Sequence, residues 1–242
     1  MMNLTVLNDT DELLNALAEQ ICESAEKAIR DHGRFDLVLS GGSSPKKLYE
    51  LLASEKFKNR IEWNKIFFFF GDERFVPAGD SQRNSLMARE ALFEPLNICS
   101  ENIFEVDTTG TPQESAEKYW QDILKHFNGE EVEFDFILLG LGDNSHTASL
   151  FPHTSVLKET EASMKSIFVE EVEMYRITMT APLINQAKEI AFLVFGRDKS
   201  EAVYHVLKEK NVSAEKYPGR LIDSDNEKVH WFLDQAAASK IV

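Results

Sequence analysis

The sequence predicts an α/β fold in which a mostly parallel sheet is covered by helices on both faces. Short, unbroken apolar runs recur along the chain, and such runs are typical of strands that are buried on both faces. Segments with apolar residues at helical spacing lie between these runs. The long runs also end in a glycine followed by polar residues, which is typical of turns at strand ends.

Three helices are predicted from apolar spacing and from start signals. Residues 10–31 carry apolar side chains at helical spacing after Asp9, and Glu12 follows three residues after Asp9, which resembles a capping box. Ser44 is followed by a proline and then by KKLYELL, so it is predicted to cap a second helix. Thr111 is also followed by a proline, and Glu114 stands three residues after it, so Thr111 is predicted to start a third helix.

Four long apolar runs are predicted to form the main strands of the sheet, at residues 35–40, 65–70, 134–139 and 190–195. Shorter runs are predicted to be edge or antiparallel strands: LTVL near the start and residues 166–171, 176–180 and 229–233. No repeat, low-complexity tract or Pro/Gly-rich linker marks a boundary. We therefore expect residues 1–242 to form a single domain.

Charge and cysteine content narrow the function classes. The chain has 41 acidic and 26 basic residues and a formal net charge of −15, which disfavours nucleic acid and anionic membrane surfaces as partners. It has neither 18 consecutive apolar residues nor a basic, apolar N-terminal leader, so we expect a soluble cytoplasmic protein. Cys22 and Cys99 lack metal-ligand spacing and are expected to be unpaired thiols.

Polar residues follow each of the long apolar runs, in the segments SGGSSP (40–45), GDER (71–74), GLGDNSH (140–146) and GRDK (196–199). Each segment alone fits an ordinary turn equally well. The carboxyl ends of parallel strands, however, meet at one edge of a sheet, and ligands bind there in open α/β folds. The repetition therefore predicts a binding site at this edge.

The segment SGGSSP predicts an anion-binding loop. Gly41 and Gly42 allow backbone N–H groups to approach a ligand, and Ser43 stands at a helix start whose partial positive charge favours phosphate or carboxylate. Neither GxxxxGK[ST] nor GxGxxG is present, so a nucleotide is not indicated. A lone surface cation is most often merely solvated. The candidate cations for a phosphate all lie next to strand ends: Arg74, Arg176 and Lys199.

His146 is the candidate general base. It follows a buried strand and a glycine turn, and an imidazole with a pKa of about 6.5 is suited to accept a proton from water. A nucleophilic serine is disfavoured because neither Ser43 nor Ser145 lies in GxSxG. Metal-dependent hydrolysis lacks support because His146 and His153 are seven residues apart and no HExxH occurs.

The chain resembles the 6-phosphogluconolactonase family in six segments, which occur in the family's order between about residues 36 and 238: SGGSSPKKLYELL, FFGDERFVP, NSLMAREAL, GLGDNSHTASLFP, RITMT and WFLDQAAA. The resemblance implies a Rossmann-like three-layer α/β/α sandwich of the deaminase/isomerase type. It also implies hydrolysis of 6-phospho-D-glucono-1,5-lactone in the oxidative pentose phosphate pathway, without a cofactor. The partner is then this small sugar phosphate, and we expect a monomer or weak homo-oligomer.

The resemblance also implies roles for single residues. His146 matches the family's general base, Asp72 and Arg74 match the DER motif, and Asn144 stands where the family usually has an aspartate. Ser145 replaces the usual glycine. Substrate and phosphate binding are assigned to Gly41, Gly42, Ser43, Arg176 and Lys199.

Two other functions remain open. A glucosamine-6-phosphate deaminase or isomerase would share the SGGSSP loop, but such relatives typically carry a glutamate in a segment like AFNEP, where this chain reads ASLFP. A non-catalytic sugar-phosphate sensor is the second alternative. The chain has no evident DNA-binding appendage, and its acidity disfavours that role.

Overall fold

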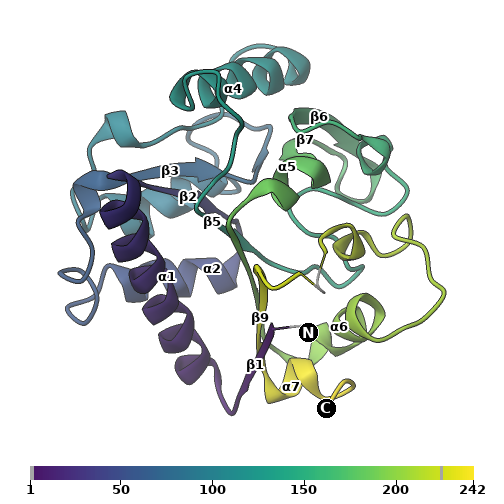
Figure 1. The fold of residues 1–242 in the computed structure, drawn as a ribbon. Coiled ribbons are helices and arrows are strands. Elements are labelled where there is room, and N and C mark those ends of the chain that lie inside the picture. Colours follow the sequence, from purple (N-terminus) through teal and green to yellow (C-terminus); the bar gives the residue numbers. More distant parts are fainter. Residues whose placement is uncertain (1–2, 224–225) are drawn as a thin grey trace.

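The structure is a computed structural model that describes residues 3–223 and 226–242. Its centre is a six-stranded sheet in the order β1-β9-β8-β5-β2-β3, in which all neighbouring strands are parallel (Figure 1). The strands of this sheet are β1 (Asn3–Leu7), β2 (Phe35–Leu39), β3 (Ile66–Phe70), β5 (Phe136–Leu139), β8 (Glu189–Val194) and β9 (Val229–Asp234). A smaller antiparallel sheet contains β4 (Asp72–Arg74), β7 (Met174–Met179) and β6 (Met164–Val169), in that order.

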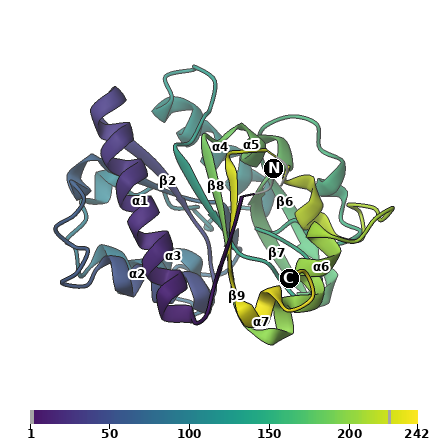
Figure 2. The same cartoon turned by 60° about the horizontal axis from the view of Figure 1, so that its bottom comes forward.

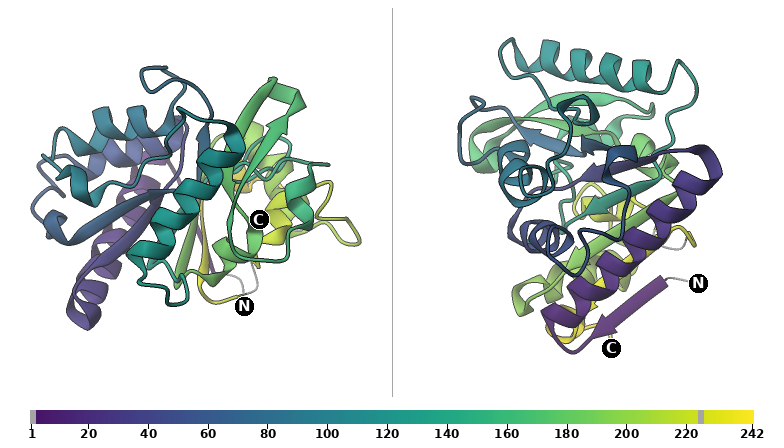
Figure 3. Two further views of the ribbon diagram at one scale, coloured as in Figure 1. Left: turned by 90° about the horizontal axis from the view of Figure 1, so that it is seen from above. Right: turned by 90° about the vertical axis from the view of Figure 1, so that its left-hand side faces the viewer.

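Helices cover both faces of the central sheet, as Figures 2 and 3 show. One layer contains α1 (Thr10–His32), α2 (Ser43–Leu52) and α3 (Asn84–Ala88). The opposite layer contains α5 (Ala181–Gln186), α6 (Ser200–Leu207) and α7 (Gln235–Ala238), together with the small sheet, and α4 (Pro112–His126) packs on that sheet. The predicted α/β fold with a three-layer arrangement is confirmed.

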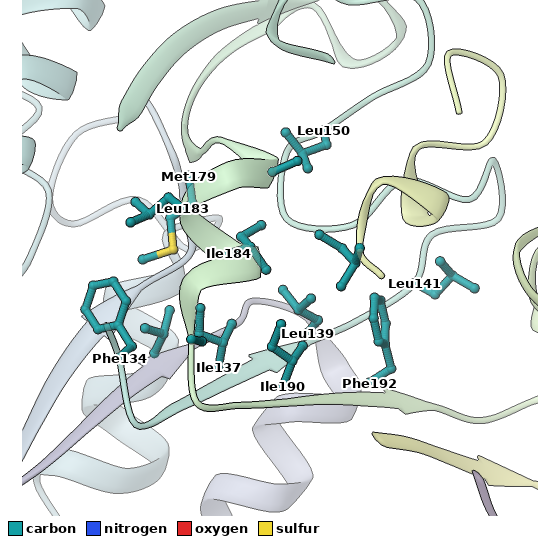
Figure 4. Close-up of a cluster of buried hydrophobic side chains, with 14 of the residues drawn as sticks. Phe134, Ile137, Leu139, Leu141, Leu150, Met179, Leu183, Ile184, Ile190 and Phe192 are labelled. Carbon is teal, nitrogen blue, oxygen red and sulfur yellow. The ribbon is translucent and has the colours of Figure 1, made fainter. Parts of the chain in front are cut away.

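Alternate side chains of the central strands fill two separate hydrophobic cores. Leu37 points into the core beneath α1 and α2, whereas its neighbour Val38 points into the core of the opposite layer. Figure 4 shows that second core, where Ile137 of β5 and Ile190 of β8 lie beneath Ile184 of α5. Burial on both faces is the reason why these strands have continuous apolar sequences.

The capping signals predict two helix starts correctly. The predicted helix 10–31 is α1, and Asp9 accepts a hydrogen bond from the backbone N–H of Glu12 at 2.9 Å. At α4 the capping box is complete, because Thr111 accepts from the backbone N–H of Glu114 while the Glu114 carboxylate accepts from the backbone N–H of Thr111.

The predicted start of the second helix is wrong. α2 begins at Ser43, and the residue before it is Gly42 rather than a capping Ser44. Gly42 has a φ of 111°, a conformation that glycine adopts readily, and it turns the chain into the helix one residue early. In the described chain no side chain caps the N-terminus of α2, so its first N–H groups are available to a ligand.

One strand prediction also needs correction, and one of the segments after a strand end forms a strand itself. Segment 229–233, predicted as an edge or antiparallel strand, lies in β9 between β1 and β8 and is parallel to both. The partly exposed His230 interrupts the apolar run of this segment, so the sequence pattern does not indicate that the strand lies inside the sheet. The segment GDER is not a simple turn. Gly71 bonds to Leu39 of the central sheet and to Met179 of β7, so the chain changes sheets there and continues as β4.

The remaining shorter runs form strands as predicted, with β1 at an edge of the central sheet and β6 and β7 antiparallel. Neither Cys22 nor Cys99 forms a disulfide in the described chain, which confirms the prediction of unpaired thiols. Of the helices in residues 3–223 and 226–242, none combines the length and apolar character that a membrane crossing requires.

Candidate active site

A cavity of about 360 Å³ opens at the carboxyl ends of β2, β5 and β8. The direction of strand addition reverses at this place, because β3 pairs with one side of β2 and the next strand of the sheet, β5, pairs with the other side. In open α/β sheets such a switch point is where ligands bind. Residues of β4 and β7 form another wall, and the volume suits a small molecule.

The cavity brings together eight of the nine residues predicted for the site: Gly41, Gly42, Ser43, Asp72, Arg74, His146, Arg176 and Lys199. The ninth, Asn144, does not line the cavity but contacts the imidazole of His146. The wall also contains Phe151 and Glu171, which the sequence analysis did not select.

Hydrogen bonds determine the tautomer of His146. Asn144 Oδ1 accepts from the backbone N–H of His146 at 3.1 Å and lies 2.6 Å from its Nδ1. The amide of Asn144 can have only this orientation, because its Nδ2 donates to Glu171 Oε2 at 2.7 Å and a carboxylate only accepts. Nδ1 therefore carries the proton, and Nε2 carries the lone pair. Among the residues that the structure describes, Nε2 has no hydrogen-bond partner.

The surroundings of His146 keep its ring neutral. Its ring stacks on Phe151 at a centroid distance of 4.0 Å. A Cβ atom on Gly142 would lie 2.1 Å from two atoms of the ring, so only glycine fits beneath it. Burial lowers the pKa of His146 to about 4, and the nearby Asp72 carboxylate opposes that shift. His146 is consequently a neutral imidazole at neutral pH, with its single proton on Nδ1.

Arg74 and Arg176 form a cationic pair in the cavity wall. They are directly opposite each other in the register of β4 and β7, and both line the cavity. Like charges at opposed positions repel. The Nε atom of each is buried and has no hydrogen-bond partner within the described chain. An anionic ligand would relieve the repulsion and supply the missing acceptors.

Further groups for an anion come from α2 and from the turn before α6. The uncapped N-terminus of α2 lines the cavity with Gly41, Gly42 and Ser43, and a helix N-terminus favours negative charge. Lys199, in the 3₁₀ turn Arg197–Lys199, also lines the cavity and forms an ion pair with the exposed Asp143.

The DER motif divides between the cavity and the protein interior. Asp72 lines the cavity and accepts a hydrogen bond from Ser149 Oγ at 2.6 Å. Glu73, on the other face of β4, is fully buried and accepts the backbone N–H groups of Arg74 and Asn84. Burial raises the pKa of Glu73 against the effect of these bonds. Glu73 thus holds the loop after β4 in place while its two neighbours face the ligand site.

Residues 8–231 match the family described as glucosamine-6-phosphate isomerases/6-phosphogluconolactonase. The chain belongs to this family. The 6-phosphogluconolactonase of Nostoc sp. strain PCC 7120 is 39% identical over 241 residues, which cover 98% of this chain and 97% of that protein. The 6-phosphogluconolactonase of Synechocystis sp. strain PCC 6803 is 37% identical over 219 residues, 89% of this chain and 88% of that protein.

Solved structures support the same assignment. The structure of 6-phosphogluconolactonase from Trypanosoma cruzi has a TM-score of 0.88 and 27% sequence identity, and the match covers 100% of this chain and 97% of that one.

Within residues 3–223 and 226–242, no three His, Cys, Asp or Glu side chains are grouped so that they could hold a metal ion.

In this member of the glucosamine-6-phosphate isomerase/6-phosphogluconolactonase family, the segment HTASLFP builds the turn behind the imidazole. Thr147 Oγ1 donates to the carbonyl of Gly140 at 2.9 Å, and the backbone N–H of Ser149 donates to Thr178 Oγ1 at 3.1 Å. Phe151 belongs to the same segment, so its position in the motif was a usable signal. Glu171 had no such signal, because its contact with Asn144 spans 27 residues.

Proposed function

We propose that the chain hydrolyses 6-phospho-D-glucono-1,5-lactone to 6-phospho-D-gluconate in the oxidative pentose phosphate pathway. The observation that carries this proposal is one cavity that holds both a neutral imidazole with an unpaired Nε2 and two arginines with unpaired Nε atoms. A base and an anion site in one cavity suit an ester that carries a phosphate. The relatives named 6-phosphogluconolactonase support this substrate.

In the proposed mechanism, His146 is the general base. Its Nε2 removes a proton from water while the oxygen of that water adds to C1 of the lactone. The tetrahedral oxyanion then collapses, the bond between C1 and the ring oxygen breaks, and the imidazolium returns the proton to that oxygen. A positioned base of this kind typically accelerates a reaction about 10²- to 10⁴-fold. Asn144 holds the required tautomer, and the charge of Asp72 favours the imidazolium.

The oxyanion and the phosphate require separate groups. Arg74 or backbone N–H groups of the turn 140–144 would stabilise the oxyanion, and one such donor typically contributes about 10²- to 10³-fold. The phosphate would bind to the uncapped start of α2 and the nearby cations, that is, to Gly41, Gly42, Ser43, Arg176 and Lys199. Binding at the phosphate then positions C1 next to Nε2 of His146.

Phe151 favours a lactonase over an amino-sugar phosphate deaminase. It occupies the position at which deaminase relatives carry the glutamate of AFNEP, and its ring stacks on His146. A ring at this position supplies no carboxylate for proton transfer. An assay has to exclude this deaminase and also the second alternative, a non-catalytic sugar-phosphate sensor.

The proposed function is tested by lactone hydrolysis with the purified chain, corrected for spontaneous ring opening. We expect turnover by the wild type, at least a 100-fold lower kcat for His146→Ala, and unchanged binding of 6-phosphogluconate to that variant. His153→Asn, an exposed histidine outside the cavity, is the matched control. Near wild-type turnover by His146→Ala would remove His146 from the base role. Ammonia release from glucosamine 6-phosphate would favour a deaminase, and ligand binding without hydrolysis would favour a sensor.

The cellular context belongs to the same proposal. Residues 1–242 would act as a single lactonase domain in the cytoplasm, as a monomer or weak homo-oligomer and without a cofactor. The shared hydrophobic core of the small sheet and the central sheet supports the single domain. Light scattering and activity after dialysis against a chelator test the oligomeric state and the absence of a cofactor.

A further inference from the structure

Glu171 connects the hairpin of the small sheet to the catalytic turn. It lies in the 3₁₀ turn Glu170–Val172 between β6 and β7, at the wall of the cavity. Its Oε2 accepts a hydrogen bond from Asn144 Nδ2 at 2.7 Å, and Asn144 Oδ1 accepts from both N–H groups of His146. The imidazole of His146, the amide of Asn144 and the carboxylate of Glu171 therefore form a chain of hydrogen bonds.

We infer that Glu171 is a positioning residue that acts on His146 through the amide of Asn144. This inference rests on the proposed function, in which His146 Nε2 removes the proton from water. It assigns to the β6–β7 hairpin a part in the reaction beyond carrying Arg176.

The chemistry of an asparagine side chain gives such a partner a function. An aspartate presents two equivalent oxygens to a histidine, whereas the amide of Asn144 has an accepting end and a donating end. If the amide turned over, its NH₂ group would face Nδ1, the proton would move to Nε2, and His146 would lose the lone pair that it needs. Glu171 opposes this rotation because its carboxylate accepts only from the NH₂ end, and it adds to the effect of the backbone N–H of His146, which donates to Oδ1.

Glu171 also strengthens the acceptor that faces the imidazole. A hydrogen bond from Nδ2 to a carboxylate polarises the amide and makes Oδ1 a better acceptor. The imidazolium that forms in the reaction is then better stabilised. The carboxylate of Glu171 thus stabilises the imidazolium of His146 through Asn144, although the direct partner of the histidine is a neutral amide.

The neighbouring glutamates offer a matched control. Glu170 and Glu173 lie in the same exposed turn, and within the described residues neither side chain forms a hydrogen bond or an ion pair. Glu170→Gln removes the same charge from the same turn without touching Asn144.

The first experiment measures kcat and KM for the 6-phosphogluconolactone. We expect Glu171→Ala to lower kcat about fivefold, Glu171→Gln to lower it less because the amide oxygen still accepts, and KM to stay within about twofold. Glu170→Gln should match the wild type. Equal kcat values for Glu171→Ala, Glu171→Gln and Glu170→Gln would overturn the inference.

The second experiment tests the sign of the effect in an Asn144→Asp background. There the two carboxylates face each other and repel, so Glu171→Gln should raise kcat, although it lowers kcat in the wild-type background. A change of the same sign in both backgrounds would overturn the inference. A wild type without lactonase activity would instead contradict the proposed function.

A third measurement does not depend on activity. In NMR spectra of ¹⁵N-histidine-labelled protein, His146 of the wild type should be protonated at Nδ1 alone, and Glu171→Ala should add the Nε2-protonated form. A tautomer that is unchanged in Glu171→Ala would show that Asn144 holds its orientation without Glu171, and would overturn the inference.

Discussion

The ring of Phe151 lies against the imidazole of His146, with the two planes inclined by only 16°. This contact covers one face of the imidazole with hydrocarbon and excludes water from it. Water stabilises the charged form of a histidine more than the neutral form, so the stacking contributes to the lowered pKa of His146. A hydrophobic side chain thereby sets the pH range in which the base is available.

The pH dependence of kcat/KM should reflect this burial. With the pKa of His146 at about 4, protonation removes the base only as the pH falls through about 4, so activity should persist well below neutrality. Phe151→Ala should admit water, raise the pKa towards about 6.5 and move the acid limb upwards. The substrate phosphate titrates in the same way with the wild type and with Phe151→Ala. The readout is therefore the difference in pH between the acid limbs of these two proteins. Phe168→Ala, at an exposed ring outside the cavity, is the control, and coincident acid limbs would contradict the prediction.

Arg176 and Lys199 should determine the affinity for the phosphate. We expect Arg176→Ala and Lys199→Ala each to raise KM for the phosphorylated lactone at least tenfold, because each removes a charge-assisted hydrogen bond. The parallel assay with glucono-1,5-lactone, which lacks the phosphate, should change much less. Unchanged KM values in both variants would show that the phosphate binds elsewhere.

A buried hydrogen bond between a histidine and a carboxylate at the opposite end of the sheet should matter for stability alone. His126 Nε2 lies 2.8 Å from Asp36 Oδ1, and both side chains are almost completely buried. His126→Ala would leave part of a buried carboxylate without its partner, so we expect the free energy of unfolding to fall by about 3 kcal/mol. Urea denaturation measures this loss, and kcat of the folded enzyme should stay unchanged. Lys27→Ala, which breaks an exposed pair, should have no measurable effect.

Local signals account for what the sequence could predict. Apolar runs and caps depend on residues within a few positions of each other, so helix 10–31 and the buried strands were recognisable. The neighbours of β9 in the sheet depend on the complete topology, and no local pattern encodes them.

The candidate site divides in the same way. Most of its predicted residues stand directly after strand ends or within the family's motifs, and the parallel sheet brings them together. Glu171 reaches Asn144 only because the β6–β7 hairpin docks beside the catalytic turn. Such a contact is set by tertiary packing, so it had no signature in the sequence.

Ser145 should be an unfavourable residue for stability beside the catalytic histidine. Its φ is +64°, a conformation that favours glycine, and its buried Oγ has no hydrogen-bond partner in the described chain. Ser145→Gly removes both unfavourable features, so we expect the free energy of unfolding to rise by about 1 kcal/mol in urea denaturation. Ser145→Ala removes the hydroxyl but keeps a Cβ at the same φ, so it should recover only part of this gain. Because Asn144 still holds His146 in either variant, kcat should stay within about twofold of the wild type. A lower unfolding free energy for Ser145→Gly than for the wild type would mean that the serine hydroxyl has a partner in solution.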